Sequence, residues 1–239
     1  MKVLLFLFKF FVKLFILGAA CTVIGFTGAY LYLTPKLDAV DELKSVQYQV
    51  PLRIYTSDHK LIAQYGEKKR IPLEYHAFPP TLVQAFISAE DDRFFHHPGV
   101  DYKGLLRAVI TLARTGERRQ GGSTITMQVA RNFFLSRKKT YLRKLNEIFL
   151  SLKIERELSK QDILALYLNK IFLGYRSYGV AAASQVYYGK PLSELTLAQH
   201  AMIGGLPKAP SAYNPIANPK RAKTRRNYVL KRMLELGYI

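Results

Sequence analysis

Two glutamates have neighbours that suit them to proton or phosphate chemistry, and Glu90 is the first. It ends an apolar stretch, and Asp91, Asp92, Phe94 and Phe95 follow it. A carboxylate beside buried aromatic rings loses hydration, so its pKa rises toward the range of a general base, and adjacent carboxylates act in the same direction. An acidic triplet that ends a helix on a solvated face would look the same, so Glu90 alone does not identify a site.

Glu147 is the second, and it shares a helix face with two cations. Arg143 lies four residues before it and Lys144 three residues before it, which are the spacings of side-chain neighbours on a helix. An exposed ion pair of this kind would contribute little to stability. However, residues 131–160 contain nine basic residues against three acidic ones. Such an excess suits an anionic leaving group such as pyrophosphate better than a neutral sugar.

A short glycine-rich segment is a third candidate, for anion binding. Residues 121–124 read Gly-Gly-Ser-Thr before a helical pattern, and backbone N–H groups at a helix start bind anions. By itself such a segment is usually only a turn, and it is not a P-loop because no Gly-Lys-Ser/Thr follows. His96 and His97 are adjacent and have no third ligand at metal spacing, which argues against a zinc site. The single cysteine, Cys21, excludes an intrachain disulfide.

The N-terminal segment is apolar enough to cross a membrane. Residues 14–33 form a run of 20 residues without a charge, and a helix of that length spans about 30 Å, the thickness of a bilayer's hydrocarbon core. Lysines at positions 2, 9 and 13 precede this run, so the positive-inside rule places residues 1–13 in the cytoplasm and the rest of the chain outside. A signal peptide cleaved after residues 18–20 is an alternative that the longer apolar run disfavours. A lipoprotein at Cys21 is another, which Gly18 disfavours.

The charge balance points to anionic partners. The chain has 36 Lys and Arg residues against 17 Asp and Glu residues, a net charge of +19. Such a balance favours polyanions. For a domain tethered outside the membrane, we expect these to be anionic lipid headgroups and lipid pyrophosphates rather than nucleic acid.

After one hairpin the chain is predicted to be mainly α-helical. The hairpin covers residues 50–64 with a polar turn at 57–60. Residues 105–113 form a nearly apolar helix, which is either buried or partly in lipid. Helix starts are predicted by good capping residues: Thr81 after Pro79 and Pro80, Ser123 or Thr124, Thr140 for a helix ending near Glu157, and the Ser159–Asp162 capping box. A last basic helix is expected from about Ala222.

Taken together, five segments resemble the ordered motifs of the family 51 peptidoglycan glycosyltransferases. They are residues 90–101, 121–132, 143–147, 160–169 and 225–230. The resemblance covers roughly residues 50–239, and five motifs in the right order are specific. The N-terminal apolar segment and residues 64–72 are most similar to class A penicillin-binding proteins of the 1A type.

The resemblance implies a mainly α, lysozyme-like fold with a cleft between two lobes, preceded by one transmembrane helix. We expect a cytoplasmic N-terminus at 1–13, a transmembrane helix at 14–33, a linker and hairpin at 34–75, and a glycosyltransferase domain at 76–239. The apolar helix at 105–113 would dip into the outer leaflet. The protein would sit in the inner membrane with its catalytic domain in the periplasm.

The implied activity is polymerisation of lipid II into β-1,4 glycan, with inversion and release of undecaprenyl pyrophosphate. Glu90 would be the general base on the acceptor hydroxyl, and Glu147 would act near the departing pyrophosphate. Arg131, Arg143 and Lys144 would supply positive charge. The resemblance places the remaining site residues in or behind the cleft: Asp91, Phe94, His97, Ser123, Thr124, Gln128, Asn132, Tyr167 and Asn169.

Arg131 stands where many members have lysine, which keeps the charge. Met127 replaces a glutamine and is expected to face the core.

Two other functions remain open at this point. A muramidase-like enzyme would also use paired carboxylates, although it has no need of cations at a neutral leaving group. A non-catalytic basic membrane tether would leave both glutamates unexplained. Residues 57–60 and 136–139 fit Ser-x-x-Lys, but without the accompanying Lys-Thr-Gly or Ser-Asp-Asn motifs they predict no penicillin binding. The chain is therefore either a fragment of a longer bifunctional enzyme or a glycosyltransferase alone.

The sequence requires no cofactor. Mg²⁺ would suit a pyrophosphate leaving group, but no dedicated ligand set is visible. The expected partners are lipid II, the growing glycan chain and other cell-wall synthesis proteins.

Overall fold

The computed structural model describes residues 2–33, 40–44, 46–49, 51–66, 69–116, 122–135 and 140–239. Gly121 of the glycine-rich segment, residues 136–139 and the linker residues 34–39 lie outside these ranges. The chain divides into two units, Met1–Ala39 and Val40–Ile239. The domain boundaries at 33/34 and 75/76 stay predictions.

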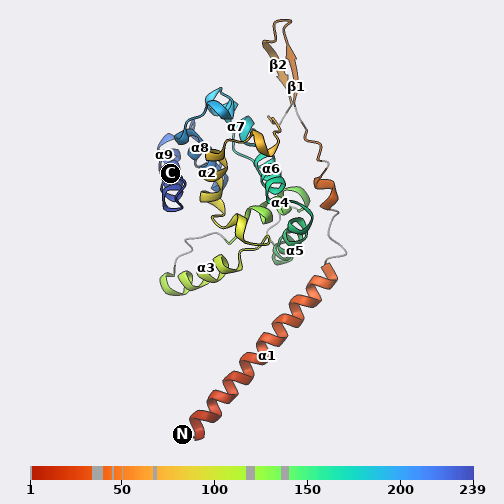
Figure 1. Cartoon of the computed structure of the whole chain (residues 1–239), viewed down its shortest axis with the longest axis vertical. Coiled ribbons are helices and arrows are strands. Elements are labelled where there is room, and N and C mark those ends of the chain that lie inside the picture. Colours follow the sequence, from red (N-terminus) through yellow and green to blue (C-terminus); the bar gives the residue numbers. More distant parts are fainter. Residues whose placement is uncertain are drawn as a thin grey trace. The chain divides into compact units, whose positions relative to one another are not determined.

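The first unit is a single apolar helix, α1 (Lys2–Leu33), drawn in red in Figure 1. Within it, Lys9–Tyr32 is long and apolar enough to cross a membrane. Among the described residues, this is the one helix that meets those criteria. The predicted helix is therefore confirmed, and its orientation in a membrane stays a prediction.

The second unit begins with the short helix η2 (Val40–Leu43), and the expected hairpin follows. Strands β1 (Leu52–Tyr55) and β2 (Leu61–Tyr65) pair antiparallel, with Leu52 opposite Tyr65. The polar turn between them includes His59 in a left-handed conformation (φ 61°). After the hairpin, Lys69 joins the chain to the helical part: its N–H donates to the Arg176 carbonyl, and its carbonyl accepts from the N–H of Tyr178.

The rest of the unit is helical, and one group of helices contains α2 (Pro80–Glu90), α8 (Leu197–Gly205) and α9 (Pro219–Glu235). Their shared core is made of small and medium-sized apolar side chains, which lets the helices approach closely: Ala85, Ala201, Val229 and Met233. A methyl group on Gly204 would come within 3.1 Å of Ala85 Cβ. This group carries the C-terminal end of α2, where Glu90 lies.

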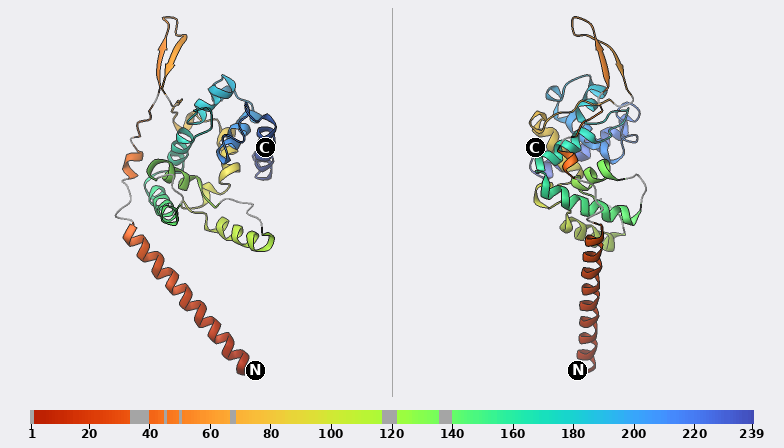
Figure 2. Two further views of the ribbon diagram at one scale, coloured as in Figure 1. Left: turned by 180° about the vertical axis from the view of Figure 1, so that it is seen from behind. Right: turned by 90° about the vertical axis from the view of Figure 1, so that its right-hand side faces the viewer.

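A second group contains α4 (Ile125–Phe134), α5 (Tyr141–Glu157) and α6 (Lys160–Lys170). The two groups meet where the rings of Phe86 on α2 and Tyr167 on α6 pack edge to face, with centroids 6.0 Å apart. Figure 2 shows the same helices from two further sides. The remaining elements connect or flank these groups: η3 (Tyr75–Ala77), η4 (Phe94–His96), α3 (Tyr102–Thr115), α7 (Val180–Tyr188), η5 (Leu192–Glu194) and η6 (Leu206–Lys208).

The mainly helical prediction is confirmed, and so are most helix starts. Thr124 caps α4, Thr140 caps α5, and Ser159 and Asp162 form the capping box of α6. The predicted cap Thr81 is wrong, because α2 already begins at Pro80 and the Thr81 hydroxyl bonds to His200 instead. The last helix begins at Pro219 rather than near residue 222, since proline is well suited to the first helical position.

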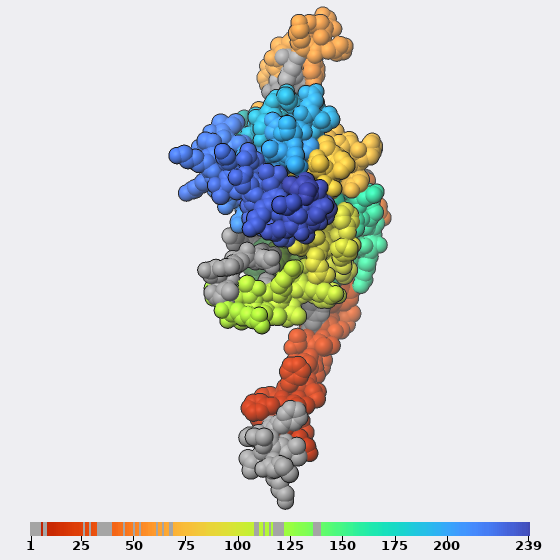
Figure 3. Space-filling model, turned by 60° about the vertical axis from the view of Figure 1, so that its left-hand side comes forward, coloured from red at the N-terminus to blue at the C-terminus, as the bar shows by residue number. Residues whose placement is uncertain are grey.

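Helix α3 does not bury its apolar side chains in the part of the chain that the structure describes. Tyr102, Leu105, Leu106 and Ile110 are between 37 % and 62 % exposed, and Figure 3 shows α3 at the surface, in yellow-green. Of the two interpretations of residues 105–113, a buried core helix is therefore wrong. Contact of this exposed face with lipid stays a prediction.

His200 predicts how stability depends on pH. Its Nε2–H donates to the Leu192 carbonyl (3.0 Å), so its Nδ1 accepts from the Thr81 hydroxyl (2.8 Å), which requires the neutral ring. Burial lowers the pKa of His200 below its usual 6.5, and the Leu192 bond opposes this only in part. The stabilisation is therefore complete above about pH 6.5 and is lost as the pH falls below it.

We expect urea midpoints of the chain in detergent to drop more between about pH 7.5 and pH 5.5 than those of His200→Gln. His76→Gln, at a histidine whose side chain is 81 % exposed, should keep the parent's pH dependence. Identical slopes in the parent and His200→Gln would contradict the assignment.

Candidate active site

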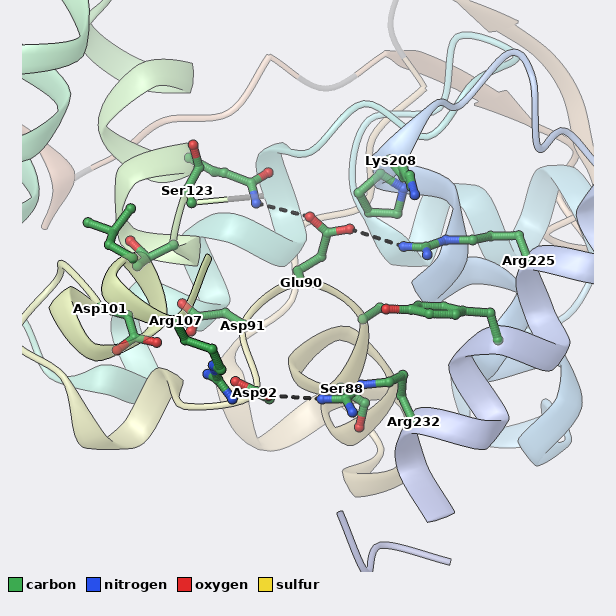
Figure 4. A pocket seen from close by; sticks show the side chains of 18 of the residues that line it. Ser88, Glu90, Asp91, Asp92, Asp101, Arg107, Ser123, Lys208, Arg225 and Arg232 are labelled. Atoms are coloured by element: carbon green, nitrogen blue, oxygen red, sulfur yellow. Dashed lines mark hydrogen bonds and ion pairs between the residues drawn. The ribbon is translucent and has the colours of Figure 1, made fainter. Parts of the chain in front are cut away.

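A cleft of about 370 Å³ lies among the ends of α2, α3, α4 and α9. Figure 4 shows that both helix groups contribute to its walls. The predicted site residues that line it are Glu90, Asp91, Ser123, Thr124, Gln128 and Arg131. The others that line it are Ser88, Ala89, Asp92, Asp101, Gly104, Leu105, Arg107, Gly122, Pro207, Lys208, Arg225, Tyr228 and Arg232.

Glu90 sits at the centre of this cleft, at the last residue of α2. Its side chain is 14 % exposed. Gln128 Nε2 donates to Oε2 (3.1 Å), and Arg225 Nη2 lies 3.7 Å from Oε1. Burial raises the pKa of Glu90, while Gln128 and the cations Arg225, Lys208 and Arg131 hold it down. The result is a desolvated carboxylate that is more basic than a free glutamate and faces an open cavity.

The two aspartates that follow Glu90 do not act as the sequence suggested. Asp91 accepts hydrogen bonds from His97 Nε2 (2.9 and 3.1 Å) and from the backbone N–H of Ile125 (2.9 Å). Asp92 pairs with Arg232 (2.8 Å). Neither is among the causes of the raised pKa of Glu90. Burial, and not repulsion by neighbouring carboxylates, therefore makes Glu90 more basic.

The start of α4 brings the described part of the glycine-rich segment to the cleft wall. Thr124 accepts from the N–H of Met127 (3.1 Å) and donates to the carbonyl of Gly99. The backbone N–H of Ile125 already donates a hydrogen bond to the Asp91 carboxylate. Ser123, whose Oγ accepts from Lys144 Nζ (2.8 Å), is the more available partner for an external anion.

Glu147 does not face the cleft. Its side chain is 1 % exposed, and its two oxygens accept hydrogen bonds from Arg143 Nη1 and from Lys144 Nζ, the latter at 2.9 Å. Burial, together with the charges of Arg131 and Arg143, lowers the pKa of Lys144 to about 8. Glu147 is thus the buried anchor of two cations, and Lys144 connects it to the cleft through Ser123.

The remaining predicted residues lie behind the lining. Phe94 is fully buried, with Lys160 Nζ 4.4 Å from its ring centre. His97 supports Asp91, and the Tyr167 hydroxyl lies 3.5 Å from Gln128 Oε1. Asn169 binds the backbone of Leu73 through both atoms of its amide (2.9 and 2.7 Å). Asn132 does not line the cleft either.

The cleft is also lined by residues that the sequence did not identify as candidates. Arg225 was noted only as part of the last motif, and Lys208, Tyr228 and Arg232 were not singled out. Positions 225, 228 and 232 recur at helical spacing, so they share one face of α9. That spacing was a usable signal, but nothing in it shows that the face meets Glu90.

The described residues were also compared with the arrangement that a metal site requires. Among the described residues, no three His, Cys, Asp or Glu side chains are grouped so as to hold a metal ion. Participation of Mg²⁺ therefore stays a prediction.

The buried position of Glu147 leads to a stability prediction. Glu147→Gln leaves Arg143 and Lys144 without their counter-charge, so we expect the free energy of unfolding to fall by about 3 kcal/mol in urea titrations. The control is Asp41→Asn in the exposed Asp41–Lys44 pair, whose side chains are 78 % and 52 % exposed. It should cost less than about 1 kcal/mol. Equal small losses in both variants would show that Glu147 does not anchor the cations.

Comparisons with known proteins assign the family. A profile of the family described as Transglycosylase matches residues 58–234. Penicillin-binding protein 1A of Pseudomonas aeruginosa is 55% identical over 216 residues, which is 90% of this chain and 26% of that protein. Penicillin-binding protein 1A of Escherichia coli is 52% identical over 233 residues, 96% of this chain and 27% of that protein.

Among solved structures, the crystal structure of penicillin-binding protein 1A from Haemophilus influenzae is 40% identical, with a TM-score of 0.47. The alignment covers 81% of this chain and 19% of that one. The chain spans about a quarter of the length of the curated relatives. Because the family profile covers most of its residues, this chain belongs to the transglycosylase family and contains a peptidoglycan glycosyltransferase domain.

Proposed function

We propose that this chain polymerises lipid II into β-1,4-linked glycan strands and releases undecaprenyl pyrophosphate. The observation that carries the proposal is the setting of Glu90. This desolvated carboxylate is held between Gln128 and Arg225 in a cleft whose opposite wall carries Ser123, beside Lys144. That arrangement supplies a base for an incoming hydroxyl and positive charge for a departing phosphate.

In the proposed reaction, Glu90 accepts the proton of the 4-hydroxyl on the acceptor sugar. The freed oxygen forms a bond to C1 of the donor sugar, and the bond from C1 to the pyrophosphate oxygen breaks. Attack from the face opposite the leaving group inverts the configuration and gives a β link. The raised pKa of Glu90 favours this proton transfer near neutral pH.

The pyrophosphate carries away the bonding electrons, and cations near its oxygens stabilise that charge. Arg131 lines the cleft, and Lys144 reaches its wall through Ser123. Glu147 acts through Arg143 and Lys144 as a positioning residue, since it is buried and each of its oxygens accepts a hydrogen bond from one of them. Asp91, His97, Thr124 and Tyr167 would hold the walls in place.

Membrane attachment supports a lipid-linked substrate. The apolar helix α1 would anchor the chain in the inner membrane with the enzyme domain in the periplasm, and the apolar face of α3 would rest in the outer leaflet. The growing glycan chain would be the donor. Association with other cell-wall synthesis proteins remains an expectation.

Glu90→Gln tests the base directly. It keeps the size of the side chain but cannot accept the proton, so we expect polymer formation from labelled lipid II to fall at least about a hundredfold. Glu74→Gln, at a glutamate whose side chain is 85 % exposed, should polymerise like the parent chain. Finished glycan should stay intact with every variant. Cleavage of glycan by the parent would favour a muramidase, and undiminished polymerisation by Glu90→Gln would refute the mechanism.

The lowered pKa of Lys144 predicts how catalytic efficiency changes at alkaline pH. Its pKa of about 8 means that its charge is lost as the pH rises through that value. The kcat/KM for lipid II should therefore decline above about pH 8, because this ratio reports ionisations of the free enzyme. Lys144→Arg keeps its charge at higher pH and should shift the decline upward. An unshifted profile in that variant would assign the decline to another group.

A further inference from the structure

Glu155, in the last turn of α5, is a nearly buried carboxylate that the mechanism above does not use. Its side chain is 8 % exposed. Its Oε1 accepts hydrogen bonds from the hydroxyl of Thr126 on α4 (2.5 Å) and from Nζ of Lys160 at the start of α6 (2.7 Å). Neither Glu155 nor Lys160 lines the cleft. One carboxylate oxygen therefore joins three helices behind the cleft.

Lys160 extends these contacts to the segment that follows Glu90. Its Nζ also donates to the backbone carbonyl of His97 (2.7 Å), and it lies 4.4 Å from the ring centre of Phe94. The ring of the same histidine is hydrogen-bonded to the Asp91 carboxylate (2.9 Å). Lys160 therefore fixes the backbone of the residue whose side chain fixes Asp91, the direct neighbour of Glu90.

Two carboxylates close these contacts into a ring. Asp91 accepts hydrogen bonds from His97 and from the backbone N–H of Ile125. Glu155 accepts from Lys160, which holds the His97 carbonyl, and from the hydroxyl of the residue that follows Ile125. Each carboxylate thus joins the segment at the end of α2 to the start of α4. Asp91 does so directly, and Glu155 does so from behind.

Close packing adds to these contacts. Gly99 has a φ of +92°, and a Cβ at this position would lie 2.7 Å from the Ser151 carbonyl oxygen and 3.0 Å from Glu155 Cγ. Glu155 therefore supports the segment by direct contact as well as through Lys160. It also follows Glu147 by eight residues, about 12 Å along the same helix. Helix α5 thus holds both the cations at one side of the reaction and the segment of the base at the other.

Stability alone is a weak reason for an ion pair between Glu155 and Lys160. The desolvation of a carboxylate and an ammonium offsets much of their attraction, and apolar side chains of similar volume often stabilise a fold equally well. Hydrogen bonds differ from apolar contacts because they fix both distance and direction. Directional contacts suit a segment that ends in Glu90, whose basicity depends on where it lies between its partners.

We propose that Glu155, acting through Lys160, is a positioning residue for the base Glu90. Neither residue touches a reacting group. Together they keep Glu90 at its distances from Gln128 and Arg225 by holding the segment that follows α2. This role rests on the proposed function, because it concerns the placement of the base in the same cleft.

Glu155→Gln and Lys160→Met test this role, because each removes one charge of the pair and keeps most of the side chain's volume. We expect kcat for polymerisation of lipid II to fall about ten- to a hundredfold in each variant. The KM should stay within about twofold of the parent value, because the groups that contact substrate remain in place. Both variants should keep the parent's helical circular dichroism spectrum.

The double variant tests whether the two residues act as one unit. Residues that act through a shared contact are not additive, so Glu155→Gln with Lys160→Met should lose no more activity than the more impaired single variant. Losses that multiply in the double variant would show that Glu155 does not act through Lys160 and would overturn the proposal.

Glu157→Gln is the matched control. Glu157 lies in the same last turn of α5, and its substitution removes the same charge. Thr126 and Lys160 donate to Glu155 instead. The kcat of Glu157→Gln should therefore equal that of the parent. An equal fall in Glu157→Gln and Glu155→Gln would assign the effect to the charge of the turn and would contradict the positioning role.

The pH profile separates positioning from charge. The acid limb of kcat/KM reports the base of the free enzyme, and burial raises the pKa of Glu90. If the segment shifts, Glu90 gains contact with water, its pKa falls, and the limb moves to lower pH in both variants. Charge alone would act differently, because loss of the Glu155 charge would lower the pKa of Glu90 and loss of the Lys160 charge would raise it.

Shifts in opposite directions, or no shift in either variant, would therefore overturn the proposal. The charged and titratable groups that face Glu90 from the surrounding elements are the same in the parent and in both variants: Arg131 on α4, Tyr167 on α6, Lys208 on η6 and Arg225 on α9.

If the parent chain makes no polymer, the proposed function fails, and the placement of Glu90 can still be measured. Isotope-labelled glutamate carboxylates can be titrated by NMR in detergent, with the Glu90 signal assigned from Glu90→Gln. The midpoint of Glu90 should be lower in Glu155→Gln and Lys160→Met than in the parent and in Glu157→Gln. An unchanged midpoint in the first two variants would refute the positioning role.

Discussion

The site depends on one electrostatic constraint, which is that a carboxylate taken out of water must be either paired or protonated. Glu90 meets this condition only in part. Gln128 gives it one hydrogen bond, and Arg225 forms an ion pair at 3.7 Å, which is too long for a hydrogen bond. A closer ion pair would lower its pKa and remove its basicity, and no partner at all would leave it protonated. The packing of α2 against α8 and α9 on one side and against α6 on the other keeps Glu90 between these limits.

Two other acidic residues, Asp91 and Glu147, stabilise the structure around Glu90. Asp91 joins the start of α4 to His97, and Glu147 holds Arg143 and Lys144 where they would otherwise repel each other. Both are nearly buried, so removing either would leave unpaired groups inside the protein. In the proposed mechanism, both residues would therefore act through the structure that they hold together.

Charge varies from one end of the cleft to the other, and this variation gives the cleft a direction. Cations gather at the start of α4 and on α5, whereas at α9 Arg232 is neutralised by Asp92 and Glu235. A molecule with an anionic end and a neutral sugar end would bind in one orientation. The apolar face of α3 borders the same cleft through Leu105, so the tail of the proposed lipid-linked substrate would lie in an apolar environment.

The sequence alone determined the helical character, the hairpin, the apolar N-terminal helix and most helix caps, because these depend on residues within a few positions of one another. It also made Glu90 a candidate, through the apolar and aromatic residues beside it together with the resemblance to the family motifs. It could not show that Glu147 points inward, that Asp91 is hydrogen-bonded and Asp92 ion-paired, or that Arg225, Tyr228 and Arg232 line the same cleft as Glu90. Helical spacing tells which side chains share a face, but only the packing of α9 against α2 decides what that face meets. The tertiary structure therefore decided which of the predicted residues line the cleft and which support it from behind.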